Sequence, residues 1–260
     1  MARPRVIPCL LLRNQGLVKT VRFKNPTYIG DPTNAVRIFN DKEVDELAFL
    51  DITAARDKRE PQFELLARMA SECFMPLSYG GGVRTIQTMR KLFALGIEKI
   101  AVNTAAVERP GFVREAADFF GSSSVVVSID ARKRRLGGYE VVTLGGQRKT
   151  GLDPARFAAT MEREGAGEVL LNSVDRDGTM TGYDLDLTRM VSSAVGIPVI
   201  ACGGAGSLED LGKVISEGGA SAAAAGSLFV FHGPHRAVLI TYPSQTQLNT
   251  ALDPMVDRSS

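Results

Sequence analysis

The chain has 260 residues, of which 44% are hydrophobic and 23% charged, and its net charge is +2. These values are typical of a folded globular protein with one large or two small α/β domains. A near-neutral charge without a long basic run argues against nucleic-acid or membrane-surface binding. We find no signal sequence and no apolar run of membrane-spanning length. Three widely spaced cysteines, Cys9, Cys73 and Cys202, predict neither a disulfide framework nor a metal site. We therefore expect a cytoplasmic protein without a metal or cofactor.

Apolar segments alternate with amphipathic ones along the chain. We expect strands near residues 6, 48, 77, 100, 126, 170, 199 and 222. The amphipathic segments predict helices at 33–40, 62–74, 108–120, 154–165, 186–195 and 208–217, the first with Thr33 as its N-cap, and a further helical segment that follows Gly82 and runs to Leu95. Between the first strand and the first helix, residues 13–32 form a long polar, basic loop that can hold a short hairpin. A second hairpin is expected at 139–143.

Eight strands alternating with helices predict a (β/α)8 TIM barrel over residues 1–242, with a doubly wound open sheet as the alternative. Residues 243–260 are polar and contain prolines, so we expect a disordered C-terminal tail. In a barrel the active site lies at the C-terminal ends of the strands.

Two strands run directly into glycine clusters, at Gly80–Gly82 and at Gly203–Gly206. Gly203 follows Gly80 by 123 residues, and Glu168 follows Glu46 by 122, each glutamate just before an apolar strand. The matched spacing predicts an internal duplication of half a barrel. Two unrelated glycine-rich turns are the simpler alternative.

Glycines at strand ends let backbone N–H groups approach an oxyanion, and a following helix adds its positive end. Two such cups predict a substrate with a phosphate at each end. Asp130 follows the fifth strand, between the cups, and a carboxylate there can act as a general acid or base. Its alternative role is a helix N-cap or an ion pair with Arg132 or Lys133.

Nine strings along residues 5–232 resemble the cyclase subunit of imidazole glycerol phosphate synthase (HisF). They are Val6–Leu10, Phe49–Ala54, Gly80–Arg84, Val102–Ala106, Ile129–Asp130, Thr150–Asp153, Asp175–Thr179, Gly182–Asp184 and Cys202–Gly206. The resemblance implies a barrel that pairs with a glutaminase. The glutaminase makes ammonia, which crosses the barrel to an aminoimidazole ribonucleotide precursor carrying two phosphates.

The resemblance also implies roles for individual residues. The family's phosphate contacts fall on Gly82, Asn103, Thr104, Asp177, Gly178, Gly204, Gly226 and Ser227, and its loop lysine falls on Lys19. Asp51 and Asn172 are further candidates for substrate binding because each ends a barrel strand. The family's second catalytic aspartate falls on Asp130. Arg5, Glu46, Lys99 and Glu168 match a ring of charges around the ammonia entrance at the opposite end of the barrel. Glu98 falls where the family contacts its glutaminase.

One position departs from the family. Leu11 stands where the first catalytic aspartate is expected, and leucine cannot transfer a proton. Asn172 and Cys202 also replace the threonine and serine that are common there. Leu11 makes the chain similar to a divergent branch, described as a second HisF or a glycosyl-amidation-associated protein. That branch is associated with sugar amidation in O-antigen (surface-polysaccharide) gene clusters.

Three hypotheses follow. In the first, the chain delivers ammonia from a glutaminase to a separate sugar amidotransferase. In the second, it is an authentic histidine-pathway cyclase in which Asp130 shares the acid–base work with another group. In the third, it is a non-catalytic barrel that binds a phosphorylated small molecule and supports a glutaminase partner.

Overall fold

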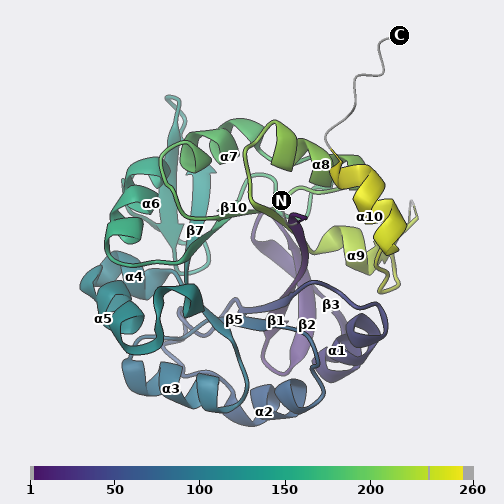
Figure 1. Cartoon of the computed structure of the whole chain (residues 1–260), viewed down its shortest axis with the longest axis horizontal. Coiled ribbons are helices and arrows are strands. Elements are labelled where there is room, and N and C mark those ends of the chain that lie inside the picture. Colours follow the sequence, from purple (N-terminus) through teal and green to yellow (C-terminus); the bar gives the residue numbers. More distant parts are fainter. Residues whose placement is uncertain (1–2, 234, 254–260) are drawn as a thin grey trace.

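The chain folds into a closed barrel of strands surrounded by helices (Figure 1). The computed structural model describes residues 3–233 and 235–253. The barrel strands are β1 (Arg5–Arg13), β4 (Leu47–Asp51), β5 (Leu77–Gly80), β6 (Lys99–Val102), β7 (Val125–Lys133), β10 (Glu168–Ser173), β11 (Val199–Cys202) and β12 (Ala222–Ala225). Each pairs in parallel with its neighbours, and the β12–β1 and β7–β10 pairings complete the ring. The predicted (β/α)8 barrel is confirmed.

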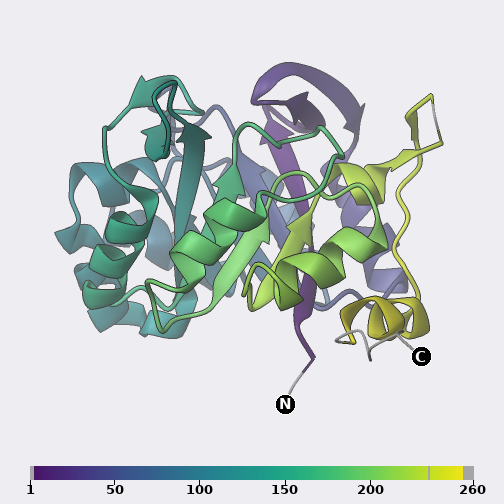
Figure 2. The same cartoon turned by 90° about the horizontal axis from the view of Figure 1, so that it is seen from above.

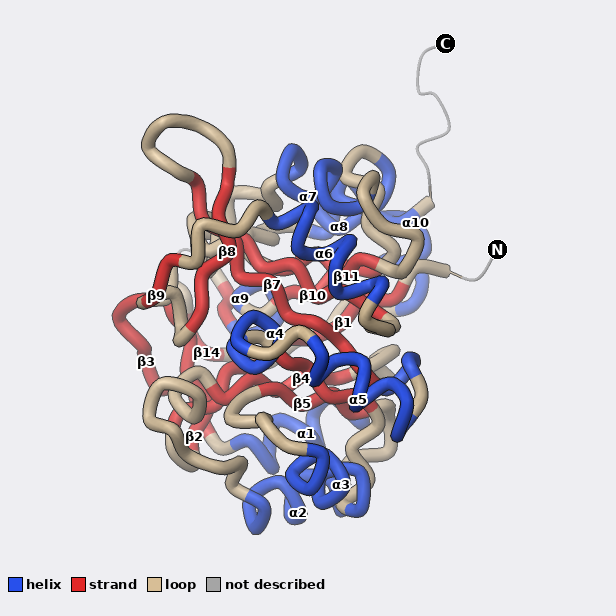
Figure 3. The backbone as a smooth tube through the Cα atoms, turned by 90° about the vertical axis from the view of Figure 1, so that its left-hand side faces the viewer, coloured by secondary structure: helices blue, strands red, loops and turns tan. Residues whose placement is uncertain are grey.

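Helices follow the barrel strands and form the outer layer (Figures 1 and 3). They are α1 (Pro32–Asp41), α2 (Phe63–Ser71), α3 (Ile86–Ala94), α4 (Thr104–Glu108), α5 (Gly111–Phe120), α6 (Pro154–Arg163), α7 (Leu185–Ser192), α8 (Leu208–Ser216), α9 (Ser227–Val230) and α10 (Gln245–Leu252), with a 3-10 turn at Ser122–Ser124. Each helix of eight or more residues buries apolar side chains of one face, which form a continuous core with the outward residues of the strands.

Three hairpins rise at the C-terminal end of the barrel, which we call the mouth (Figure 2). The first extends β1 through β2 (Gly16–Val21) and β3 (Lys24–Gly30). The second extends β7 through β8 (Tyr139–Thr143) and β9 (Arg148–Lys149). The third pairs β13 (Phe231–His232) with β14 (Ala237–Val238). The long loop expected at 13–32 is therefore an ordered antiparallel hairpin.

The internal repeat predicted from the spacing recurs in the structure. Asp31 caps α1 and Asp153, 122 residues later, caps α6, each accepting a bond from the third backbone N–H of its helix. Thr85 and Ser207 cap α3 and α8 in the same way and at the same interval. The glycine pairs before these caps, Gly81–Gly82 and Gly203–Gly204, all have positive φ. Equal spacing of turns and caps makes the two halves of the barrel alike in backbone.

Two sequence expectations need correction. The N-cap of α1 is Asp31 and not Thr33, because Pro32 opens the helix. Residues 245–252, expected to be disordered, form α10, which starts at a capping box between Ser244 and Gln247. Its Leu248 and Leu252 are buried, and the chain approaches α8 so closely that a Cβ on Gly212 would lie 2.1 Å from the Ala251 carbonyl oxygen. Residues 254–260 lie outside the described residues.

Candidate active site at the barrel mouth

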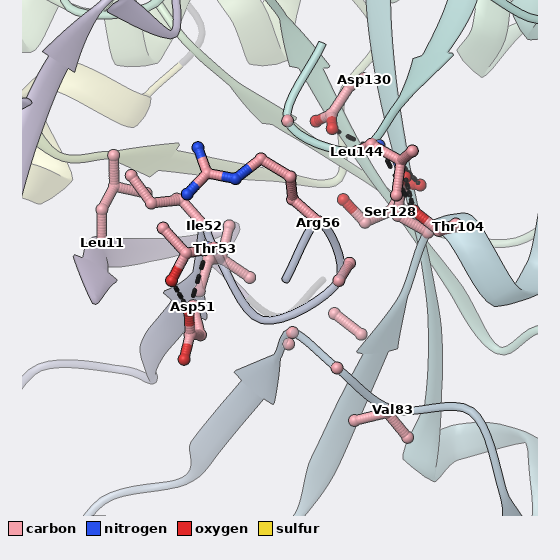
Figure 4. Close-up of a pocket in the computed structure, with 18 of the residues that line it drawn as sticks. Leu11, Asp51, Ile52, Thr53, Arg56, Val83, Thr104, Ser128, Asp130 and Leu144 are labelled. Carbon is pink, nitrogen blue, oxygen red and sulfur yellow. Dashed lines mark hydrogen bonds between the residues drawn. The ribbon is translucent and has the colours of Figure 1, made fainter. Parts of the chain in front are cut away.

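A cavity of about 310 Å³ opens at the mouth of the barrel (Figure 4). Its volume is at the lower end of the range for small-molecule sites. One side consists of the predicted first cup, namely Gly80–Gly82 with Asn103 and Thr104. The first and second hairpins contribute Phe23 and Leu144 from above. The structure therefore gathers the first cup and the hairpins around one cavity.

The second cup lies beside a much smaller cavity of about 30 Å³. Gly203, Gly204, Gly226 and Ser227 line it. The side chain of Lys19 fills the rest: its Nζ donates a 2.8 Å hydrogen bond to the Cys9 carbonyl oxygen, and the residue is only 7% exposed. A Cβ on Gly226 would lie 1.8 Å from this Nζ, so the lysine needs glycine there. The space left holds about two or three water molecules, so this cup accepts a phosphate only if Lys19 swings out.

Burial lowers the pKa of Lys19, since desolvation penalises its charged form. The nearby charge of Asp177 opposes this effect. Asp177 itself is held in place by its neighbours, because its Oδ2 accepts bonds from Thr20 Oγ1 at 2.7 Å and Phe23 N at 3.1 Å. Asp177 and Gly178 thus lie at the second cup, as expected, and also anchor the first hairpin.

Three side chains line both cavities and separate them: Leu11, Leu50 and Asn172. Leu11 points inward from β1 and is directly paired with Leu50 of β4. On the other side of the barrel Asp130 of β7 is paired with Asn172 of β10. The position expected to hold a catalytic aspartate is therefore part of an apolar wall (Figure 4).

Among the carboxyl groups at this site, Asp130 has the most strongly shifted pKa. Desolvation, with a smaller contribution from the negative charge of Asp177, raises its pKa to about 7. Asn103 Nδ2 lies 3.4 Å from its Oδ2. No ion pair joins Asp130 to Arg132 or Lys133 in the described residues, and it caps no helix there. A carboxyl group that titrates near neutrality can donate or accept a proton.

Asp51 was predicted to bind substrate, but its carboxylate is occupied by internal partners. Oδ1 accepts hydrogen bonds from Thr53 N and Ala54 N, both at 3.0 Å, and Oδ2 pairs with Arg59 at 2.8 Å. These bonds close the turn that follows β4. Asp51 borders the cavity, and its side chain shapes the loop that carries Arg56 over it (Figure 4).

At the opposite end of the barrel, four charged residues form one connected group that we call the floor ring. Arg5 donates to Glu46 and, at 2.7 Å, to Glu168; Lys99 donates to Glu46 at 3.1 Å and to Glu168 at 3.0 Å. All four point inward, and the structure brings together the residues that the resemblance assigned to one ring. Glu98 lies beside the ring, exposed to solvent.

The sequence reasoning missed several contributors to the interior. Ser78 donates a hydrogen bond to Glu46 and is buried. Ser128 and Ala101 line the bottom of the mouth cavity. Alternation along the strands could have identified them, because they share the inward face with the residues that were chosen. Arg56 and Gln147 come from loops whose path no local pattern indicates.

No helix in the described part of the chain has the length and apolar character needed to cross a membrane. The fold and the mouth cavity together define a TIM-barrel protein with a small-molecule site at the C-terminal ends of its strands.

The chain belongs to the family of histidine biosynthesis proteins, which it matches over residues 5–235. It is 55% identical to the "Putative imidazole glycerol phosphate synthase subunit hisF2" of Pseudomonas aeruginosa, covering 96% of this chain and 99% of that protein. It is 49% identical to the HisF relative of Leptospira borgpetersenii, covering 95% and 97%. It is 45% identical to the hisF3 relative of Vibrio vulnificus, covering 97% and 98%. The chain is thus a HisF-like member of this enzyme family.

Proposed function

We propose that this barrel conducts ammonia from a glutaminase to a separate enzyme that amidates a sugar of a surface polysaccharide. The observation that carries the proposal is Leu11. Cyclisation with two acid–base groups across one substrate needs a proton-transferring side chain on each side. Here Asp130 faces the apolar pair Leu11 and Leu50, while the floor ring keeps all four charges.

Small side chains support a route through the barrel. Ala48 and Ala101 lie two residues beyond Glu46 and Lys99 along the chain, and Ser78, on the strand between them, is in register with Lys99. The mouth cavity reaches down to Ala101, which is two residues, or about 7 Å, from Lys99 along the same face. A small neutral molecule that passes the floor ring therefore has little side-chain volume to cross. The other side of the interior is filled by Ile7, Leu170 and Ile200.

We expect the glutaminase to dock against the floor ring. The ring is partly open to solvent, since the Arg5 side chain is 29% exposed. Glu98, which is exposed, directly precedes Lys99 of the floor ring in the chain. Large apolar side chains such as Phe74, which is 88% exposed, also lie at strand and helix ends on this side. A charged centre with exposed aromatic groups around it suits a protein interface.

An authentic cyclase is the second candidate. It is favoured by the 310 Å³ cavity and by an Asp130 that titrates near neutral pH. The printed names of the relatives point the same way. In this case a second group would have to replace the carboxyl that Leu11 lacks.

The two candidates differ in a direct assay. The purified chain is incubated with the aminoimidazole ribonucleotide and ammonium at high pH, and imidazole glycerol phosphate is measured. Our proposal expects no turnover above the rate without protein, and clear turnover would overturn it.

A second assay tests conduction. The barrel, its glutaminase and the sugar amidotransferase are combined with glutamine, and amidated sugar is measured for wild type, Lys99→Ala and Glu46→Ala. We expect both variants to lose glutamine-dependent amidation and to retain amidation with added ammonium. Unchanged glutamine-dependent amidation would contradict conduction and favour a barrel that only supports its partner.

A further inference from the structure

The three mouth hairpins differ in charge from the rest of the molecule. Residues 13–30, 131–149 and 231–238 contain eleven Lys and Arg but one acidic residue, Glu140. The remainder of the chain has twenty Lys and Arg and twenty-eight Asp and Glu. A nearly neutral chain therefore has a strongly basic mouth and an acidic body, and such a separation steers partners of opposite charge to one face.

Most of these basic groups lack a counter-charge of their own. Lys133, Arg148 and Lys149 pair with carboxylates, and Lys19 is buried in the second cup. The other seven have no carboxylate within salt-bridge distance in the described residues; they are Arg13, Arg22, Lys24, Arg132, Arg134, Arg135 and Arg236. Arg22, Lys24, Arg134 and Arg135 are exposed.

Large apolar side chains are exposed on the same hairpins. Tyr28 of β3 is 67% exposed, and Leu136, at the tip of the second hairpin, has no contact that shields it. Val21 and Val238 are exposed on the first and third hairpins. A small anionic substrate needs positive charge but gains nothing from Leu136, which lies in the turn between β7 and β8 and does not line the cavity. Arginine mixed with aromatic and aliphatic groups is typical of protein interfaces.

The hairpins are fixed to one another through the loop Asp175–Gly178. In the first hairpin, Arg22 N donates a hydrogen bond to Asp177 O at 2.9 Å. In the second, Lys133 N donates a hydrogen bond to Asp175 Oδ2 at 2.7 Å. In the third, Arg236 Nη2 donates a hydrogen bond to Gly178 O at 2.8 Å. The rim is thus one preformed surface around the cavity, and binding to it costs little ordering of loops.

We infer that this basic rim is the docking surface for an acidic face of the enzyme that consumes the ammonia. The inference rests on the proposed function. Ammonia released into water at neutral pH becomes protonated, as alkylamines do, and loses its nucleophilic lone pair. The consuming enzyme must therefore cover the mouth. A partner with surface carboxylates around an apolar patch matches the rim in charge and in character.

The test uses the full-length chain with its glutaminase and a purified sugar amidotransferase. Arg135→Glu and Leu136→Asp change the rim at positions that line neither cavity. Lys213→Glu makes the same charge reversal on the outer face of α8 and is the matched control. The readouts are the Kd for the amidotransferase at low and high salt, glutamine-dependent amidation, and amidation with added ammonium.

We expect each rim variant to raise the Kd about tenfold or more and to lower glutamine-dependent amidation in proportion. Lys213→Glu should behave as wild type, and added ammonium should restore amidation with every variant. Wild-type binding should weaken as salt rises. If the rim variants bind and transfer as wild type does, the inference is overturned while conduction stands. If wild-type barrel and glutaminase support no amidation, the proposed function fails and the inference fails with it.

A nucleic acid is the other macromolecule that a basic rim could hold. A 20-nucleotide RNA is titrated against wild type and Arg135→Glu in parallel. Tight RNA binding that depends on Arg135, without binding of the amidotransferase, would overturn the inference in favour of a nucleic-acid ligand.

Discussion

The two halves of the barrel share a backbone repeat but differ in several side chains on the inward face. The floor of the first half carries Arg5, Glu46 and Lys99, and at its mouth Leu11 is paired to Leu50. In the second half Glu168 repeats Glu46, but Lys99 is matched 123 residues later by Ala222, and the mouth carries Asp130 paired to Asn172. Leu50 and Asn172 are 122 residues apart, the interval of the repeat.

This difference separates what maintains the fold from what determines the chemistry. The paired caps and positive-φ glycines occur in both halves because each βα turn needs them. The inward side chains are free to differ, because each layer of a small barrel only has to fill the interior. Asp130, the acid–base group that we propose, therefore has no carboxyl counterpart at Leu11.

The largest expected effect comes from making the first half resemble the second. The variant Leu11→Asp with Leu50→Asn reproduces the Asp130–Asn172 pair across the cavity. We expect cyclisation of the ribonucleotide with ammonium to rise by about 10²–10⁴-fold, the usual contribution of a general acid or base. Adding Asp130→Asn to this variant should remove the gain. A folded double variant with no gain would mean that Leu11 is not what prevents cyclisation.

The floor ring predicts a large effect on stability. Lys99→Met leaves Glu46 and Glu168 buried with only Arg5 to compensate them. We expect the free energy of unfolding, measured with urea at pH 7, to fall by about 3–5 kcal/mol. Lys42→Met removes an exposed lysine and should change it by less than about 0.5 kcal/mol. Equal effects of the two variants would show that the ring is energetically neutral.

Asp130 predicts a dependence of stability on pH. Its pKa is raised from 3.8 to about 7, so the folded state holds the proton more tightly, and this group's contribution to stability is lost as pH rises from about 4 to 7. Asp130→Asn has no carboxyl group at this position and therefore does not lose this stability as the pH rises. The quantity to compare is the free energy of unfolding of the variant minus that of wild type. We expect this difference to be about 1–4 kcal/mol larger at pH 8 than at pH 4. Urea unfolding at both pH values measures this difference, and a constant difference would contradict the raised pKa.

The caps provide the smallest and most symmetrical test of the two halves. Thr85→Ala and Ser207→Ala each remove one N-cap bond from equivalent helices. We expect each to lower the free energy of unfolding by about 1 kcal/mol. Ser207→Ala should cost slightly more, because Asp210 completes a capping box there. Thermal or urea unfolding of both variants detects this, and a neutral Ser207→Ala would indicate that the second half does not need its cap.

Much of the site could be predicted because it lies on regular elements. The strand positions follow from apolar runs. The floor ring was implied by the family resemblance, and its residues meet because parallel strands bring their starts to the same edge. Asp130 was identified because it ends a strand, and Leu11 because it stands where the family has a catalytic aspartate. Asp51 was also chosen as a strand end, yet its carboxylate closes a turn with Ala54 and Arg59. A strand end indicates which edge a side chain occupies but not which partners it takes.

By itself, the sequence determined the barrel, its internal repeat and the family, because these depend on local periodicity, turn residues and motifs within short segments. Only the tertiary structure decided that Lys19 fills the second cup and that the 175–178 loop joins the three hairpins. It also decided that residues 245–252 form a helix against α8. These features depend on contacts between residues far apart in the chain. Their energies come from burial and hydrogen bonds that exist only once the barrel has closed.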